Sequence, residues 1–136
     1  MWLPAPGTHI CPLEALAEKP ARSFILRGDT DAQQIDVIIW REGQEILGFV
    51  NQCPHLHLPL ETMPDRLLNN AQTALLCSAH GAQFDRQGFC FIGPCKGDAL
   101  KRLDVAVMDT RVDTTDGKPN EPDQPSVVLN GWFETP

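Results

Sequence analysis

Cys53-Pro54-His55 and Cys77-Ser78-Ala79-His80 are the two stretches on which the interpretation of this sequence depends. In each run a cysteine stands two or three positions before a histidine. Thiolate and imidazole groups bind transition metals, so the pattern predicts a metal centre held by Cys53, His55, Cys77 and His80. A zinc finger usually offers a cysteine pair and then a histidine pair, whereas both pairs here are mixed. The mixed order suits a [2Fe-2S] cluster with two cysteines on one iron and two histidines on the other, because each loop can then reach both irons.

The sequence around these pairs resembles the Rieske family of iron–sulfur proteins. Residues 53–61 are similar to the first cluster loop of that family and residues 77–85 to the second. Gly88 and then Gly93-Pro94-Cys95 follow, where the family has a loop that folds over the cluster, and Leu100 to Val105 resembles the strand that returns to the base. The sequence departs from the family at His57, where glycine is common, and in a longer connection between the pairs. The similarity is greatest to small stand-alone Rieske proteins and ferredoxins.

The fold class indicated by the residues is all-β. Short apolar runs separated by glycine and proline predict an antiparallel β-sandwich or barrel. The resemblance implies a Rieske-type fold with a small inserted cluster-binding subdomain at about residues 51–96. A chain of 136 residues is the usual size of one domain, so we expect residues 1–136 to form a single Rieske domain.

The predicted strands flank the two cysteine–histidine pairs. A hairpin is expected from Gln34–Trp40 and Glu45–Asn51, joined by a turn, and it leads directly into the first pair. The other strands are expected at Phe24–Leu26, Ala74–Cys77, Phe89–Ile92, Leu103–Val107 and Val127–Phe133. The only stretch of good helix formers is Pro12–Lys19. Residues 113–125 are polar and contain several prolines, which predicts a loop before a final edge strand.

Composition and charge favour a cytoplasmic protein that acts on other proteins. The net charge is −7, which does not favour nucleic acid as a partner and would suit a basic patch on a redox partner, although solubility alone also explains it. The N-terminus has no secretory signal, and no apolar run approaches the roughly 20 residues of a membrane span. We therefore expect a cytoplasmic location and no membrane association. The sequence does not indicate an oligomeric state.

The five cysteines do not suggest a disulfide scaffold, because their number is odd. Besides the two predicted ligands, Cys11, Cys90 and Cys95 are expected to be buried thiols that pack as small apolar side chains. Cys90 and Cys95 are close in sequence, but sequence does not establish their distance in space.

The resemblance also bears on the reduction potential. In the high-potential branch of the family each cluster loop carries an additional cysteine, and a serine and a tyrosine donate hydrogen bonds to sulfur. The corresponding positions here are Leu58, Ala79, Ala82 and Phe84. Because hydrogen bonds to sulfur stabilise the reduced state, their loss predicts a low-potential, ferredoxin-like centre.

The function expected from these features is one-electron transfer by a Rieske-type ferredoxin, from a flavin reductase to an oxygenase or another acceptor. No nucleotide-binding loop, catalytic acid, base or nucleophile is evident, so the chain is more an electron-transfer protein than an enzyme on its own. One alternative is a Rieske-like small subunit of a larger redox enzyme such as assimilatory nitrite reductase. Another is a zinc-loaded or iron-sensing domain that uses the same four ligands. The partner surface is expected around Leu56, His57, Leu58 and Pro94.

Overall fold

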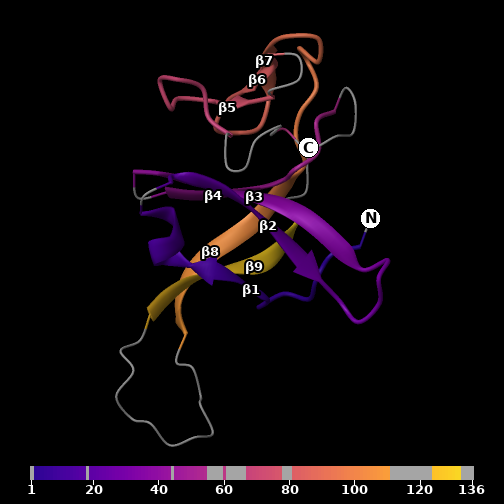
Figure 1. The fold of residues 1–136 in the computed structure, drawn as a ribbon, viewed down its shortest axis with the longest axis vertical. Coiled ribbons are helices and arrows are strands. Elements are labelled where there is room, and N and C mark those ends of the chain that lie inside the picture. The colour runs from indigo at the N-terminus through magenta and orange to yellow at the C-terminus, as the bar shows by residue number, and fades with distance from the viewer. Residues whose placement is uncertain are drawn as a thin grey trace, which may run out of the picture.

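The computed structural model describes residues 2–17, 19–43, 45–54, 60, 67–77, 81–110 and 124–132. In this part of the chain nine strands form two antiparallel sheets, and the one helix is a single 3-10 turn (Figure 1). In chain order the elements are β1 (His9–Pro12), η1 (Leu13–Leu16), β2 (Ala21–Arg27), β3 (Gln34–Glu42), β4 (Glu45–Val50), β5 (Leu75–Leu76), β6 (Gln83–Phe84), β7 (Cys90–Ile92), β8 (Arg102–Thr110) and β9 (Gln124–Trp132).

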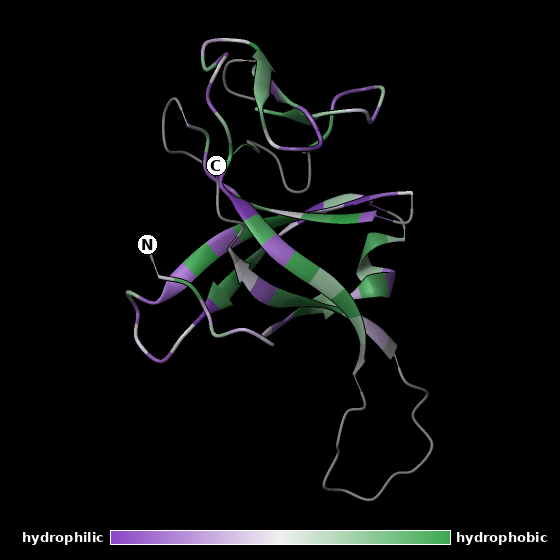
Figure 2. Cartoon of the chain, turned by 180° about the vertical axis from the view of Figure 1, so that it is seen from behind, coloured by the Kyte–Doolittle hydropathy of each residue, from purple (hydrophilic) through white to green (hydrophobic). Residues whose placement is uncertain are grey.

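The larger sheet has six strands in the order β1-β9-β8-β4-β3-β2. All five pairings are antiparallel. The two end strands, β1 and β2, also contact each other, so the sheet is nearly closed into a barrel. Figure 2 shows hydrophobic and hydrophilic residues alternating along its long strands, the pattern of strands with one buried face. The all-β prediction is confirmed.

The smaller sheet, with the order β5-β6-β7, lies beyond one side of the larger sheet (Figure 1). Its residues are inserted in sequence between β4 and β8, two neighbouring strands of the larger sheet. The insertion begins and ends at one place, because the Val50 N–H donates a hydrogen bond to the Lys101 carbonyl at 2.9 Å. An ion pair adds a contact: Arg86, next to the β6–β7 turn, lies 2.7 Å from the Glu42 carboxylate at the end of β3.

Strand β3 explains how the two sheets share the hydrophobic core. Its run Val37-Ile38-Ile39-Trp40 is buried throughout, which is unusual for an antiparallel strand with one wet face. Val37 and Ile39 pack into the core of the larger sheet, whereas Ile38 and Trp40 pack into a second core beneath the smaller sheet. The apolar run in the sequence therefore marks a strand that is covered on both faces.

Most strand predictions are confirmed, including the hairpin of β3 and β4, whose register pairs Glu42 with Glu45. Two expectations are wrong. The helix former stretch Pro12–Lys19 yields only the 3-10 turn Leu13–Leu16. The last strand is not an edge strand, since β9 pairs with β8 on one side and with β1 on the other. Strand β1, which the sequence did not reveal, takes the edge instead.

Candidate metal centre

The first cluster loop is fixed at its base by Asn51. This side chain is only 4% exposed, and its Oδ1 accepts a hydrogen bond from the Leu60 N–H at 2.9 Å. The Asn51 N–H in turn donates to the Asp36 carbonyl on β3 at 2.9 Å. Asn51 thus joins the start of the loop, its return at Leu60 and the larger sheet. Cys53 follows two residues later and is buried, 2% exposed.

The second cluster loop begins at Cys77, directly after β5, and Cys77 is 1% exposed. Two backbone hydrogen bonds close this loop. The Cys77 N–H donates to the Ala82 carbonyl at 2.7 Å, and the Gly81 N–H donates to the Cys77 carbonyl at 2.9 Å. Gly81 has φ +72°, a conformation that glycine adopts without strain. The sequence Cys77 to Ala82 therefore makes a tight turn anchored in the smaller sheet.

A third loop, Gly93 to Asp98, packs back on β7. The Cys90 N–H donates to the Asp98 carbonyl at 2.9 Å, and the Gly97 N–H donates to the Cys90 carbonyl at 3.2 Å. Within the loop the Asp98 N–H donates to the Cys95 carbonyl at 2.8 Å. Gly93, Pro94 and Lys96 are exposed, whereas Cys95 is buried. The loop thus directs one sulfur inward beneath a solvent-exposed backbone.

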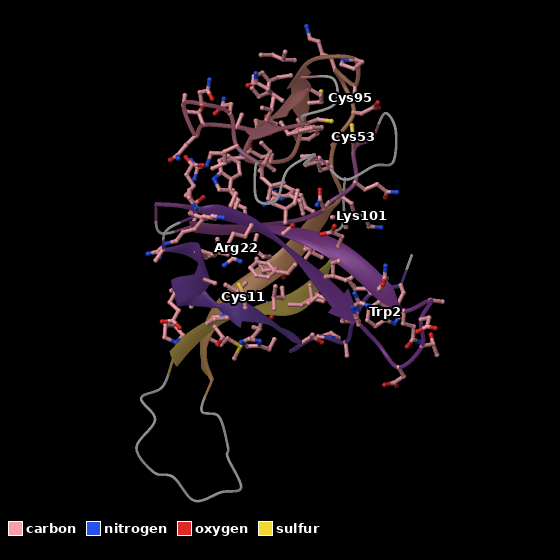
Figure 3. All side chains as sticks on the ribbon, in the orientation of Figure 1. Trp2, Cys11, Arg22, Cys53, Cys95 and Lys101 are labelled. Carbon is pink, nitrogen blue, oxygen red and sulfur yellow. The ribbon has the colours of Figure 1, made fainter. Side chains whose placement is uncertain are left out.

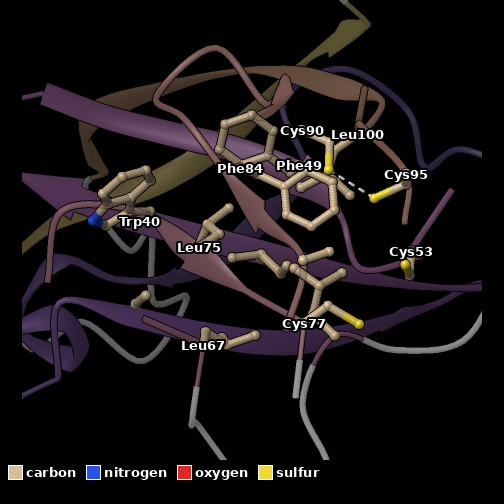
Figure 4. Packing of buried hydrophobic residues seen from close by; sticks show 14 residues of the cluster. Trp40, Phe49, Cys53, Leu67, Leu75, Cys77, Phe84, Cys90, Cys95 and Leu100 are labelled. Atoms are coloured by element: carbon tan, nitrogen blue, oxygen red, sulfur yellow. Dashed lines mark hydrogen bonds between the residues drawn. The ribbon is translucent and has the colours of Figure 1, made fainter. Parts of the chain in front are cut away.

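These three loops bring four of the five cysteines into one buried cluster. Cys53, Cys77, Cys90 and Cys95 all belong to the core beneath the smaller sheet and lie at one end of it, opposite Trp40 (Figure 4). The Sγ atoms of Cys95 and Cys90 are 2.9 Å apart, and the Cys90 Sγ lies 3.2 Å from the Ile92 carbonyl oxygen. The fifth cysteine, Cys11, lies in the larger sheet, away from Cys53 and Cys95 (Figure 3).

Cys95 is the residue of this site that sequence reasoning undervalued. Burial raises the pKa of its thiol to about 12, and hydrogen bonding and charge from Cys90 and then from Cys53 act in the same direction. The thiol is therefore protonated and next to a predicted ligand. A sequence signal existed in the spacing of Cys90 and Cys95, but only the backbone hydrogen bonds of the third loop show that their sulfurs meet. The prediction that both are buried thiols is confirmed.

Two of the four predicted ligands can be placed. Cys53 and Cys77 come from separate loops, and the structure brings both into the same cluster. His55 and His80 lie outside the described residues, as do His57, Leu58 and Ala79. Within the described ranges, no group of three or more histidine, cysteine, aspartate or glutamate side chains has the arrangement of a metal site. The four-residue ligand set therefore stays a prediction.

The sequence matches the Rieske [2Fe-2S] domain family over residues 9–109, about three quarters of the chain. The chain belongs to the Rieske family. The match spans all three loops and most of the larger sheet. The cofactor of such a domain is a [2Fe-2S] cluster, and the residues present fit it, because two buried thiols from separate loops converge where the family binds iron.

Solved structures share the fold of this Rieske domain at low sequence identity. The ferredoxin of carbazole 1,9a-dioxygenase from Nocardioides aromaticivorans IC177 superimposes with a TM-score of 0.60 at 20% identity, covering 93% of this chain and 99% of that one. A chain of a complex of reduced oxygenase and oxidized ferredoxin in carbazole 1,9a-dioxygenase gives 0.60 at 15% identity, with 94% and 96% covered. The plasma membrane Rieske protein PetC3 from Synechocystis PCC 6803 gives 0.50 at 15% identity, with 88% and 97% covered. No curated protein matches the sequence.

The surroundings of the Rieske centre agree with the absence of the two hydroxyl donors. Ala82 and Phe84 are both fully buried and offer no hydroxyl group to a sulfur. In the described part of the chain, no helix has both the length and the apolar character to cross a membrane.

Proposed function

We propose that this Rieske protein is a ferredoxin that carries one electron from a reductase to an oxygenase. The observation that carries the proposal is the convergence of Cys53 and Cys77 from two loops at the end of the smaller sheet, in a chain that the family covers from residue 9 to residue 109. The bound cluster would supply one-electron redox chemistry. Solved ferredoxins of carbazole dioxygenase have nearly the same extent as this chain, which supports a stand-alone carrier.

The chain's own residues would have distinct roles in this function. Cys53, His55, Cys77 and His80 would hold the irons, the two cysteines from the buried side. Asn51 holds the first loop closed, and the hydrogen bonds between Cys77 and Ala82 do the same for the second. The buried core around Phe49 and Phe84 keeps water from the cysteine side, so electrons would pass by the histidine side. Residues 1–136 would act as one domain, with residues 51–96 as its cluster-binding part.

A surface next to the third loop has the character of a docking site for a partner protein. Phe89, Phe91 and Ile92 are 54%, 43% and 47% exposed, and they adjoin the exposed Pro94. Exposed aromatic and aliphatic side chains in one segment are typical of protein-binding surfaces. We therefore assign partner docking to Phe89, Phe91, Ile92 and Pro94. Leu56, His57 and Leu58, the other predicted contacts, lie outside the described residues.

The deciding experiment is anaerobic purification followed by iron and sulfide analysis and by optical and electron paramagnetic resonance spectra of the dithionite-reduced protein. A red-brown protein with about two irons and two sulfides per chain and a g-average near 1.9 is expected for a mixed cysteine–histidine cluster. A colourless protein that holds zinc, or no metal after anaerobic reconstitution, would refute the electron-carrier function and favour a zinc-loaded domain or a binding subunit.

The acceptor is tested separately by stopped-flow mixing of the reduced protein with an oxygenase whose own cluster is oxidised. Phe91→Glu should slow transfer while leaving the spectrum and potential unchanged, because it changes only the docking surface. Ile25→Glu is a matched control, since Ile25 is 52% exposed on β2 of the larger sheet. Equal rates for both variants would exclude the assigned surface. The alternative, a small subunit of an enzyme such as assimilatory nitrite reductase, stays a prediction, as does the cytoplasmic location.

A further inference from the structure

Cys90 and Cys95 are held side by side by backbone contacts that do not involve their sulfurs. Two hydrogen bonds tie the backbone of Cys90 to Gly97 and Asp98, and a third joins Asp98 to the carbonyl of Cys95. The connecting loop turns at Gly93 and Gly97, whose φ angles of +105° and +99° suit glycine. The positions of both residues are therefore set by the loop itself.

The sulfurs are already close to bonding distance. The Sγ atoms lie 2.9 Å apart, against about 2.05 Å in a disulfide. Cys90 and Cys95 are 4% and 1% exposed, so the contact is shielded from water. Cys95 also interacts with the predicted ligand Cys53, which puts the pair directly beside the cluster.

We propose that Cys90 and Cys95 are a dithiol–disulfide pair, a second redox site of this protein that closes against the cluster ligand Cys53. The oxidant is a low-molecular-weight disulfide such as oxidised glutathione. One cysteine loses its proton and attacks the oxidant, which releases one thiol and leaves a mixed disulfide. The second cysteine then loses its proton and displaces the other half. In total the two protein sulfurs lose two protons and two electrons, and the oxidant becomes two thiols.

The burial of the pair makes this reaction slow. Gly93, Pro94 and Lys96 are exposed and cover Cys95, so an oxidant reaches the sulfurs only when the third loop opens. The loop bonds of Lys96 to Gly93 and of Gly97 to Cys90 are the longer ones, both 3.2 Å, which suits opening there. We expect oxidation to be limited by this opening and its rate to level off at high oxidant concentration.

The bond is detected in a single peptide. Trypsin cleaves after Arg86 and Lys96 and releases residues 87–96, which contain both cysteines. The cluster-loaded protein is incubated anaerobically with oxidised glutathione, denatured in acid, alkylated with N-ethylmaleimide and digested. We expect this peptide to be two hydrogens lighter and unalkylated, and to accept two alkyl groups after reduction. A peptide that is fully alkylated, or that carries glutathione on one cysteine without closing the bond, would overturn the proposal.

Two internal comparisons support the assignment. Cys11 is equally buried, but it lies in the larger sheet, away from this pair, so its peptide should stay alkylated under the same conditions. Cys90→Ala and Cys95→Ala should each abolish the two-hydrogen loss. Because the peptide mass is measured whether or not the cluster transfers electrons, this test is independent of the proposed electron-carrier function.

The link to the cluster has its own readout. Closing the bond removes the Cys95 S–H group beside Cys53, and losing a donor to a ligand sulfur lowers the potential. The midpoint potential measured after glutathione oxidation should therefore be lower than that of the dithiol form, and Cys90→Ala should not respond to oxidised glutathione. An unchanged potential in the protein with the closed bond would contradict the coupling to the cluster.

Discussion

At the scale of single residues, the cysteines differ in what their substitution should do. Cys77→Ala should abolish iron binding, because the residue supplies a thiolate from the second cluster loop. Cys11→Ala is the matched control, since Cys11 is buried to a similar degree but lies in the other core. The measurement is the iron and sulfide content of both variants after anaerobic reconstitution. Full cluster content in Cys77→Ala would show that the ligand set is wrong.

Cys11 also predicts a change of stability with pH. Burial raises the pKa of its thiol from 9.0 to about 11. Above pH 9 the unfolded chain releases this proton while the folded chain keeps it until about pH 11, so the free energy of unfolding falls across that window by ~2–3 kcal/mol. Below pH 9 the residue contributes no pH dependence. Urea unfolding of the reduced protein between pH 8 and 11 should show this loss, and Cys11→Ala should have a smaller slope.

Asn51 is a third residue with a specific role. Asn51→Ala would leave the buried Leu60 N–H without its 2.9 Å acceptor, at a cost of about 1–3 kcal/mol. The first loop should open more often as a result, so we expect faster loss of the cluster to an iron chelator. Thr73→Ala, in an exposed turn, provides the comparison for a lost polar contact elsewhere. Equal rates of iron loss in the two variants would mean that Asn51 does not hold the loop.

At the scale of elements, the third loop depends on two glycines that differ in their surroundings. Both have positive φ angles, so alanine at either one costs about 1–3 kcal/mol. At Gly93 a Cβ would also stand 2.7 Å from the Cα of Ala82, whereas at Gly97 it would meet nothing within 4 Å. Gly93→Ala should therefore lower the free energy of unfolding more than Gly97→Ala and should shift the cluster spectrum. Urea titration and the reduced-state resonance spectrum test both statements.

The elements also show where sequence patterns succeed and fail. The hairpin of β3 and β4 was predictable, because a long apolar run, a turn and a second run leave few alternatives. Strands β1 and β6 have four and two residues, too few for a periodic signal, and they exist because long-range partners hold them. Missing β1 also led to the wrong edge assignment for β9. At the site, Cys53 and Cys77 were predictable from spacing, whereas Asn51 and the contact of Cys90 with Cys95 required the folded backbone.

At the scale of the whole molecule, the net charge of −7 predicts how the protein meets its partner. Attraction to a basic surface speeds association, and dissolved salt screens it. The second-order rate constant of electron transfer to the oxygenase should therefore fall as ionic strength rises from 0.01 to 0.3 M, about a fivefold change in Debye length. A rate constant independent of salt would mean that the acidic surface serves solubility alone.

The position of Trp40 gives the whole molecule an internal optical probe. This indole is 1% exposed and packs in the core that the two sheets share, so it stays dry only while the smaller sheet is docked. Separation of the sheets would expose it to water and shift its fluorescence emission to longer wavelength, even while the circular dichroism of the larger sheet persists. Emission that shifts before the circular dichroism changes, and that no longer does so in Trp40→Phe, would show the cluster-bearing half of the molecule detaching before the rest unfolds.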